Sequence, residues 1–233
     1  MTKIITDSSN YVNIASAIRA QTGTSESFKP SQMAEAISGI ETGGGGGGNE
    51  DALLARTISV YENSTATAIG NFAFASCTSL TSVSLPAVTT IGPYAFQYCS
   101  ALTTVSLPAA TSIGSNAFQS CYALATVNLP AATSIRANAF AYCTSLTSVS
   151  LPQATSIEGY AFGSCSRLTT VSLPQATSIG VYAFLSCTSL ASIDLPAATS
   201  IGNGAFYSCS AFTSISLPAA KSIDRKSTRL NSS

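Results

Sequence analysis

Apolar and polar positions recur along this chain with a period of 22 residues. The first full copy reads LTSVSLPAVTTIGPYAFQYCSA. Six full copies follow one another, beginning at Leu80, Leu102, Leu124, Leu146, Leu168 and Leu190. Self-similarity at a fixed interval is typical of solenoids, because no single unit can bury its own apolar side chains. The repeat therefore predicts a stack of coils that share a continuous core.

Each unit contains two apolar stretches, which predict two kinds of element. Val83 alternates with Ser82 and Ser84, which favours a short strand with its serines facing outward, ended by a proline. In the stretch AFxxC, Phe96 and Cys99 lie three residues apart and so share one face of a helical turn. We therefore expect an α/β repeat, a right-handed parallel solenoid built from short strands and short helical turns.

The segments before and after the repeats have sequence patterns of their own. Ile14 and Ile18 lie at helical spacing, as do Met33 and Ile37, which predicts a helical hairpin before the repeats. Glycines 43–48 favour a flexible tether, because no Gly-Lys-Ser/Thr follows them to bind phosphate. The predicted segments are a helical hairpin module at 1–42, a glycine-rich linker at 43–57, a degenerate capping repeat at 58–79, six full repeats at 80–211, a partial repeat at 212–223 and a terminal stretch at 224–233.

The composition excludes several classes of functional site. Only 9% of the residues are charged, the formal net charge is zero and there is no histidine. A neutral chain lacks the excess of positive charge that binds nucleic acid. Without histidine, neither a Ser-His-Asp nor a Cys-His catalytic site can be built from this chain alone. No unit carries an insertion that could form a cleft, and no apolar run is long enough for membrane insertion. We therefore expect no enzyme activity, no cofactor and no binding of nucleic acid.

A column of cysteines is the most conspicuous set of side chains. One cysteine stands at the same position of each coil: Cys77, Cys99, Cys121, Cys143, Cys165, Cys187 and Cys209. Parallel stacking points these side chains the same way, and cysteine is a common small apolar filler of cores. A buried ladder of free thiols is the leading interpretation, with occasional disulfides or a metal site as the alternatives, and no metal site is assigned.

Outward-facing polar side chains on the strands form a candidate ligand-binding surface. Its members are Ser84, Ser106, Asn128, Ser150, Ser172 and Asp194. A rigid ladder of donors and acceptors suits a polymeric ligand such as a surface glycan, or a partner protein. The alternative is that a surface with few charges needs these residues for solvation alone. An ice-binding array is disfavoured because the column mixes residue types.

Tyrosines in the turns form a second candidate surface. Tyr94, Tyr160 and Tyr182 occupy one column, and tyrosine offers both apolar area and a hydroxyl group to a ligand. Partial burial against the next coil is the alternative. Arg136 and Glu158 are equivalent residues of adjacent coils, so we expect an ion pair between them that contributes about 0 to 1 kcal/mol.

The pattern LxxVxLPxxxxxIGxxAFxxCxx resembles the BspA-like leucine-rich repeat of bacterial surface proteins, over residues 58–223. Arg136 and Glu158 depart from it, since each replaces the glycine that follows isoleucine. The resemblance implies a leucine-rich-repeat solenoid with a binding role outside the cell or on a particle surface, generally adhesion, and no catalysis.

Both ends of the chain carry resemblances of their own. NIASAIRAQTGTSESFKPSQMAEAISGI is similar to a short module of tail and other structural proteins of phages that infect Gram-positive gut bacteria. DRKSTRLNSS, at residues 224–233, resembles the translation of a common sequencing-library adapter, so we expect it to be an artefact and the chain to be a metagenomic fragment of a protein with further repeats.

These observations lead to three hypotheses about function. The first is a phage virion protein, tail or fibre-like, made in the bacterial cytoplasm. Its N-terminal module would dock to other virion proteins, and its solenoid would face a glycan or protein of the host surface. Its motivation is the N-terminal resemblance together with the absence of a signal-peptide core from residues 1–10. The alternatives are a BspA-like adhesin of the bacterial cell surface and the targeting region of an enzyme whose catalytic domain is missing.

Overall fold

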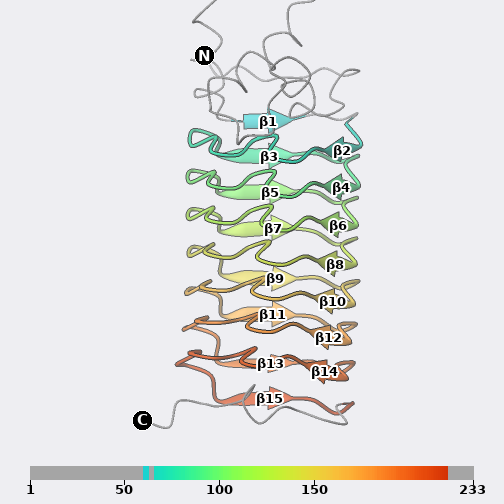
Figure 1. The fold of residues 1–233 in the computed structure, drawn as a ribbon, viewed down its shortest axis with the longest axis vertical. Helices are drawn as coiled ribbons and strands as arrows, with labels where there is room; N and C mark the ends of the chain where they lie inside the picture. The colour runs from blue at the N-terminus through green and yellow to red at the C-terminus, as the bar shows by residue number, and fades with distance from the viewer. Residues whose placement is uncertain (1–59, 63–65, 220–233) are drawn as a thin grey trace, which may run out of the picture.

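Two short strands form in each 22-residue unit of the computed structural model, which describes residues 60–62 and 66–219 (Figure 1). The three-residue strands are β1 (Val60–Glu62), β3 (Ser82–Ser84), β5 (Thr104–Ser106), β7 (Thr126–Asn128), β9 (Ser148–Ser150), β11 (Thr170–Ser172), β13 (Ser192–Asp194) and β15 (Ser214–Ser216). The two-residue strands are β2 (Ala68–Ile69), β4 (Thr90–Ile91), β6 (Ser112–Ile113), β8 (Ser134–Ile135), β10 (Ser156–Ile157), β12 (Ser178–Ile179) and β14 (Ser200–Ile201).

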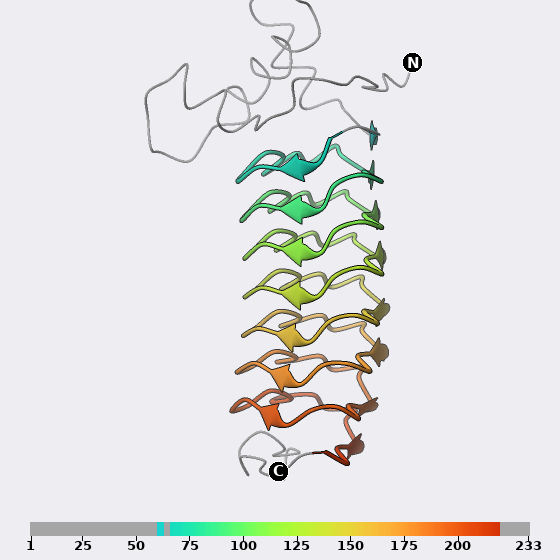
Figure 2. The ribbon, with the colours of Figure 1, turned by 90° about the vertical axis from the view of Figure 1, so that its right-hand side faces the viewer.

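All strand pairings are parallel and join equivalent residues of successive coils. Val83 pairs with Val105 in one sheet, and Ile91 pairs with Ile113 in the other. The three-residue strands form two sheets, β1-β3-β5-β7 and β9-β11-β13-β15, on the side that we call the strand face. The two-residue strands form a continuous sheet of seven strands on a second side (Figures 1 and 2). The register confirms the predicted 22-residue coil.

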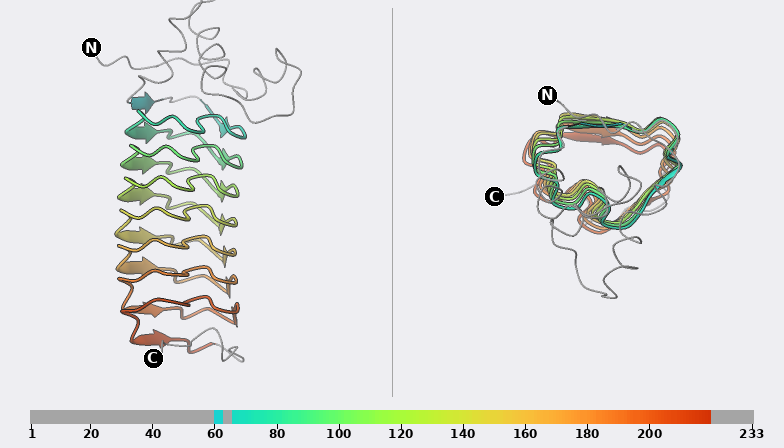
Figure 3. Two further views of the ribbon diagram at one scale, coloured as in Figure 1. Left: turned by 60° about the vertical axis from the view of Figure 1, so that its left-hand side comes forward. Right: turned by 90° about the horizontal axis from the view of Figure 1, so that it is seen from above.

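The coils superpose closely when the solenoid is seen from above (Figure 3). Equivalent apolar side chains of successive coils therefore stack in columns, and they are buried inside the solenoid. The alternation predicted for the strand is present, since Val83 is buried between two partly exposed serines. Phe96, Phe118 and Phe140 are fully buried, and their rings stack with centroids 5.1 and 5.2 Å apart. The core is therefore shared between coils, as expected for a solenoid.

The stretch AFxxC forms consecutive β-turns in place of the expected helical turn. Tyr94 and Tyr98 have φ angles of 59° and 61°, in the left-handed region that a right-handed helix excludes. Alternate amides consequently bond in different directions: Gln97 donates to the carbonyl of Tyr94 in its own coil at 3.2 Å, whereas Phe96 donates to Ala117 in the next coil at 2.7 Å. A helix would use these amides internally, so the turns are what allow the backbones of adjacent coils to bond.

The first coil of the stack is formed by part of the predicted capping repeat, where β1 pairs with β3 and β2 pairs with β4 in the common register. The helical hairpin predicted at 1–42, the linker at 43–57 and the terminal stretch at 224–233 lie outside the described residues. The part of the chain that the structure describes contains no helix with the length and hydropathy needed to cross a membrane.

Candidate binding surfaces

The strand face brings one half of the predicted serine column together. Ser84, Ser106 and Asn128 stand in register on β3, β5 and β7. With the neighbouring outward residues they line a shallow depression of about 380 Å³. Ser84 and Ser106 are half-buried and Asn128 is exposed. This arrangement presents hydroxyl and amide groups along an extended, uncharged surface.

The second half of the same column lies on a separate sheet. Ser150 pairs with Ser172, which pairs in turn with Asp194, on β9, β11 and β13. All three residues are exposed. Because β7 and β9 belong to different sheets, the predicted column is interrupted between Asn128 and Ser150.

The cysteine column lies in the core, with Cys99 through Cys209 buried and Cys77 half-buried. All seven are free thiols. Six donate a hydrogen bond from Sγ to the carbonyl oxygen of the phenylalanine one coil earlier, at 3.0 to 3.2 Å, and these are Cys99, Cys121, Cys143, Cys165, Cys187 and Cys209. Burial raises the pKa of Cys121 and of Cys165 to about 12. These thiols are therefore protonated donors at neutral pH.

The predicted ion pair between adjacent coils is confirmed. A guanidinium nitrogen of Arg136 lies 3.1 Å from Oε1 of Glu158, on the surface of the solenoid. Oε2 of Glu158 also accepts a hydrogen bond from the amide of Ala137 at 3.1 Å. Glu158 therefore joins two coils through both of its carboxylate oxygens.

The tyrosines of the turns differ in how far they pack on their neighbours. Tyr94 is half-buried and stacks on Phe72, with ring centroids 4.7 Å apart. Tyr160 is 40% exposed and lies 5.1 Å from the ring of Tyr182, tilted by 35°. Tyr142, in a neighbouring column, is 49% exposed. We call the side of the solenoid that carries these residues the turn face.

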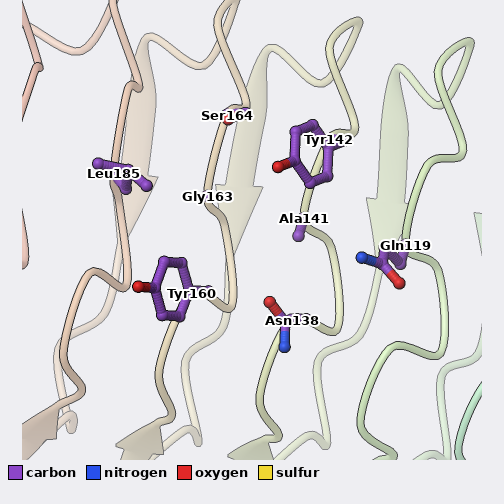
Figure 4. Close-up of a pocket in the computed structure, with 8 residues that line it drawn as sticks. All are labelled: Gln119, Asn138, Ala141, Tyr142, Tyr160, Gly163, Ser164 and Leu185. Atoms are coloured by element: carbon purple, nitrogen blue, oxygen red, sulfur yellow. The ribbon is translucent and has the colours of Figure 1, made fainter.

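A notch interrupts the turn face, and its lining residues come from the second to the fifth full coils (Figure 4). It has a volume of about 270 Å³ and is lined by Gln119, Asn138, Ala141, Tyr142, Tyr160, Gly163, Ser164 and Leu185. Sequence reasoning identified Tyr160 as a candidate contact but did not find the notch. The available signal was the pair of small residues, Ala141 and Gly163, at a position where the other four full coils carry glutamine, leucine or tyrosine.

Sequence reasoning also missed a threonine ladder beside the second sheet. Thr89 donates both its amide and its Oγ1 to the carbonyl of Thr67, at 2.8 and 3.1 Å. The same pair of hydrogen bonds recurs along the column at Thr111, Thr133, Thr155, Thr177 and Thr199. The signal was a threonine at the same place in every full unit. Because its hydroxyl groups donate hydrogen bonds to the backbone of the preceding coil, this column stabilises the stacking of the coils.

The chemistry available on these surfaces is hydrogen bonding and stacking. Among residues 60–62 and 66–219 there is no group of three or more histidine, cysteine or acidic residues that could hold a metal ion.

The sequence matches the family described as the BspA type leucine-rich repeat region (6 copies), over residues 56–134 and 133–228. These matches cover well over half of the chain. No curated protein matches it.

Several solved structures are similar to the solenoid. A leucine-rich repeat protein from Eubacterium ventriosum ATCC 27560 is 30% identical, with a TM-score of 0.54, over 64% of this chain and 44% of that chain. A leucine-rich cell surface protein from Faecalibacterium prausnitzii A2-165 is 28% identical, with a TM-score of 0.45, over 68% of this chain and 60% of that chain. A leucine-rich repeat protein from Bacteroides ovatus ATCC 8483 is 26% identical, with a TM-score of 0.48, over 70% of this chain and 56% of that chain. The chain thus spans between 44% and 60% of the length of these structures.

Proposed function

Because the chain belongs to the BspA-type leucine-rich repeat family, we propose that its solenoid is a non-enzymatic binding module displayed at a bacterial cell surface, where it adheres to a glycan or protein of a host or neighbouring cell. The observation that carries this proposal is the rigid, repeated surface of the described coils. Serine, threonine and asparagine side chains stand in register along the strand face over a continuous apolar core. Such a surface offers many weak contacts to an extended ligand.

The chemistry of the coils supports binding rather than catalysis. Burial raises the pKa of Cys121 and of Cys165, so these two thiols lack the thiolate that a nucleophile needs. Arg136 and Glu158, which have opposite charges, are paired with each other on the surface. The enzyme-targeting hypothesis therefore places any catalysis in a separate domain.

A second candidate location is the phage virion, and the resemblance of NIASAIRAQTGTSESFKPSQMAEAISGI to phage structural proteins favours it. In that arrangement the N-terminal module docks to other virion proteins and the solenoid faces the host. The solenoid is a binding module in both arrangements, so location and binding are tested separately.

Location is tested by antibody labelling of intact cells and of purified phage particles from the source culture. Labelling of cells supports the surface adhesin, and labelling of particles alone overturns it in favour of the virion protein. Binding is tested with the full chain on immobilised cell-wall glycans, host glycans and extracellular-matrix proteins. Saturable binding supports the proposal, and absence of binding to all of them overturns it.

A further inference from the structure

We propose that the turn-face notch binds one ring of an uncharged sugar, held between Tyr142 and Tyr160. This inference rests on the proposed binding function and assigns it a site and a ligand class. It also moves the specific contact away from the strand face, where sequence reasoning placed most candidate residues.

The notch exists because two adjacent coils carry small side chains at one position. Ala141 and Gly163 form its floor, whereas Gln119 precedes them and Leu185 follows them in the same column. The volume of about 270 Å³ lies just below the range of about 300 to 1,000 Å³ that is usual for drug-sized ligands. The space therefore suits a single ring rather than an extended segment of chain.

The walls of the notch are aromatic, and the backbone of both tyrosines lies in the left-handed region, as it does at the equivalent residues of other coils. Tyr142 has a φ angle of 62°, a left-handed conformation that costs roughly 1–2 kcal/mol for a residue other than glycine. In the described part of the chain its ring stacks on no other ring, and its side chain is 49% exposed. Five other coils place serine at this position: Ser76, Ser120, Ser164, Ser186 and Ser208. A tyrosine here thus presents a large apolar surface that the fold does not need.

The polar groups beside the rings supply one donor and one acceptor. Oε1 of Gln119 accepts hydrogen bonds from Gln97 and Asn116, at 2.7 and 2.8 Å, which fixes the orientation of its amide. Figure 4 shows the amide nitrogen of Gln119 turned toward the notch and the side-chain oxygen of Asn138 turned toward Tyr160. Within the described coils neither of these two atoms has a protein partner.

This combination distinguishes among ligand classes. None of the lining residues is charged, so a phosphate, a carboxylate or a basic side chain would find no opposite charge in the notch. A sugar ring has apolar C–H faces that stack on aromatic rings and hydroxyl groups that both donate and accept. Two tyrosine rings, an amide donor and an amide acceptor match those groups.

The notch is also rigid, and within the described coils no other two successive coils carry a pair of small residues at the position of Ala141 and Gly163. Asn138 and Tyr142 donate their amides to carbonyls of the next coil, at 3.0 and 2.8 Å, so the walls need little reorganisation on binding. The strand face repeats nearly the same serines and threonines from coil to coil, whereas the turn face differs at every coil. A ligand that must recognise one place on the solenoid finds it only where the coils differ.

The test is saturation-transfer NMR on the full chain, with the methyl glycosides of glucose, galactose, mannose and N-acetylglucosamine as probes. Tyr142→Ser removes one wall, and Gly163→Gln fills the floor with the side chain that Gln119 already places in this column. Tyr98→Ser makes the same change, and Ala75→Gln introduces the same side chain, at equivalent positions outside the notch, so both serve as controls. We expect at least one glycoside to bind, and both notch variants to weaken it at least tenfold while the controls leave it unchanged.

Three outcomes overturn the proposal. If all four variants bind a glycoside equally, the sugar site lies elsewhere, and the binding function survives without the notch. If Asn128→Ala on the strand face abolishes sugar binding while the notch variants do not, the strand face is the site. If no glycoside binds although the chain still binds a protein, the ligand class is wrong. If the unmodified chain binds neither glycans nor proteins, that separate result overturns the proposed function itself.

Discussion

The thiol of Cys121 donates a hydrogen bond to the main-chain oxygen of Phe96, one coil earlier, across 3.1 Å. This contact explains why the column contains cysteine rather than alanine, because the thiol both fills space and satisfies a buried carbonyl. It also joins the backbone of one coil to a side chain of the next. The stability of the stack therefore depends on the column.

Cys143→Ala is expected to lower the free energy of unfolding by about 1–3 kcal/mol, since it removes a buried thiol together with its hydrogen bond. Urea denaturation followed by circular dichroism measures the change. Cys77→Ala is the matched control. Because Cys77 is half-buried at the start of the ladder, its replacement should lower the free energy of unfolding by less. Equal losses in the two variants would show that the bond between coils contributes nothing.

Stability is expected to fall as pH rises above about 9. Burial raises the pKa of Cys121 from 9.0 to about 12, so the folded chain retains a thiol proton that the unfolded chain releases within this window. Stability from this source is complete below pH 9 and is lost as pH approaches 12. Urea midpoints measured between pH 7 and pH 11 test the prediction, with Cys121→Val as the control for tyrosine ionisation. A smaller alkaline loss in Cys121→Val supports it, and an identical loss contradicts it.

Gly114→Ala is expected to destabilise the chain by about 1–3 kcal/mol. A Cβ at Gly114 would lie 2.6 Å from the carbonyl carbon of Gly92, which is backbone and cannot rotate away. Gly159→Ala is the control, because its Cβ would approach nothing closer than 3.1 Å, at the oxygen of Val181. Thermal unfolding of both variants distinguishes them, and a larger loss in Gly159→Ala would contradict the closer approach of the backbone at Gly114.

Glu158→Ala is expected to cost more stability than Arg136→Ala. Both variants lose an exposed ion pair that contributes about 0 to 1 kcal/mol, but only the first also removes the acceptor for the amide of Ala137. A double-mutant cycle at low and at high salt measures the coupling, which salt should reduce. A larger cost for Arg136→Ala, or a coupling that grows with salt, contradicts this description.

The 22-residue period was enough to predict the register, the buried face of each strand and the interior cysteines. In a stack of identical coils each residue lies over its equivalent, so Val83 and Val105 are neighbours once the period is known. The turns were harder to predict. A spacing of three between Phe96 and Cys99 fits a helical turn and also fits consecutive β-turns, and the sign of φ separates the two.

Tyr94 gives no indication of a positive φ, but Asn138 and Gly204 in the same column do, since both residue types tolerate left-handed backbone. The notch was missed for a different reason. It depends on side chains that are small, at Ala141 and Gly163, and small apolar residues carry no binding chemistry that a sequence pattern could indicate. The three-dimensional arrangement of the neighbouring tyrosines was needed to make that space recognisable.

The hydrogen bonds between coils run along the axis of the solenoid, and this has a mechanical consequence. A molecule held at one end and pulled at the other bears the load through each junction in series, so the weakest junction yields first while the rest stay closed. Each released coil of 22 residues adds roughly 75 Å of slack. We therefore expect a stack of this kind to lengthen in steps of equal size when it is stretched.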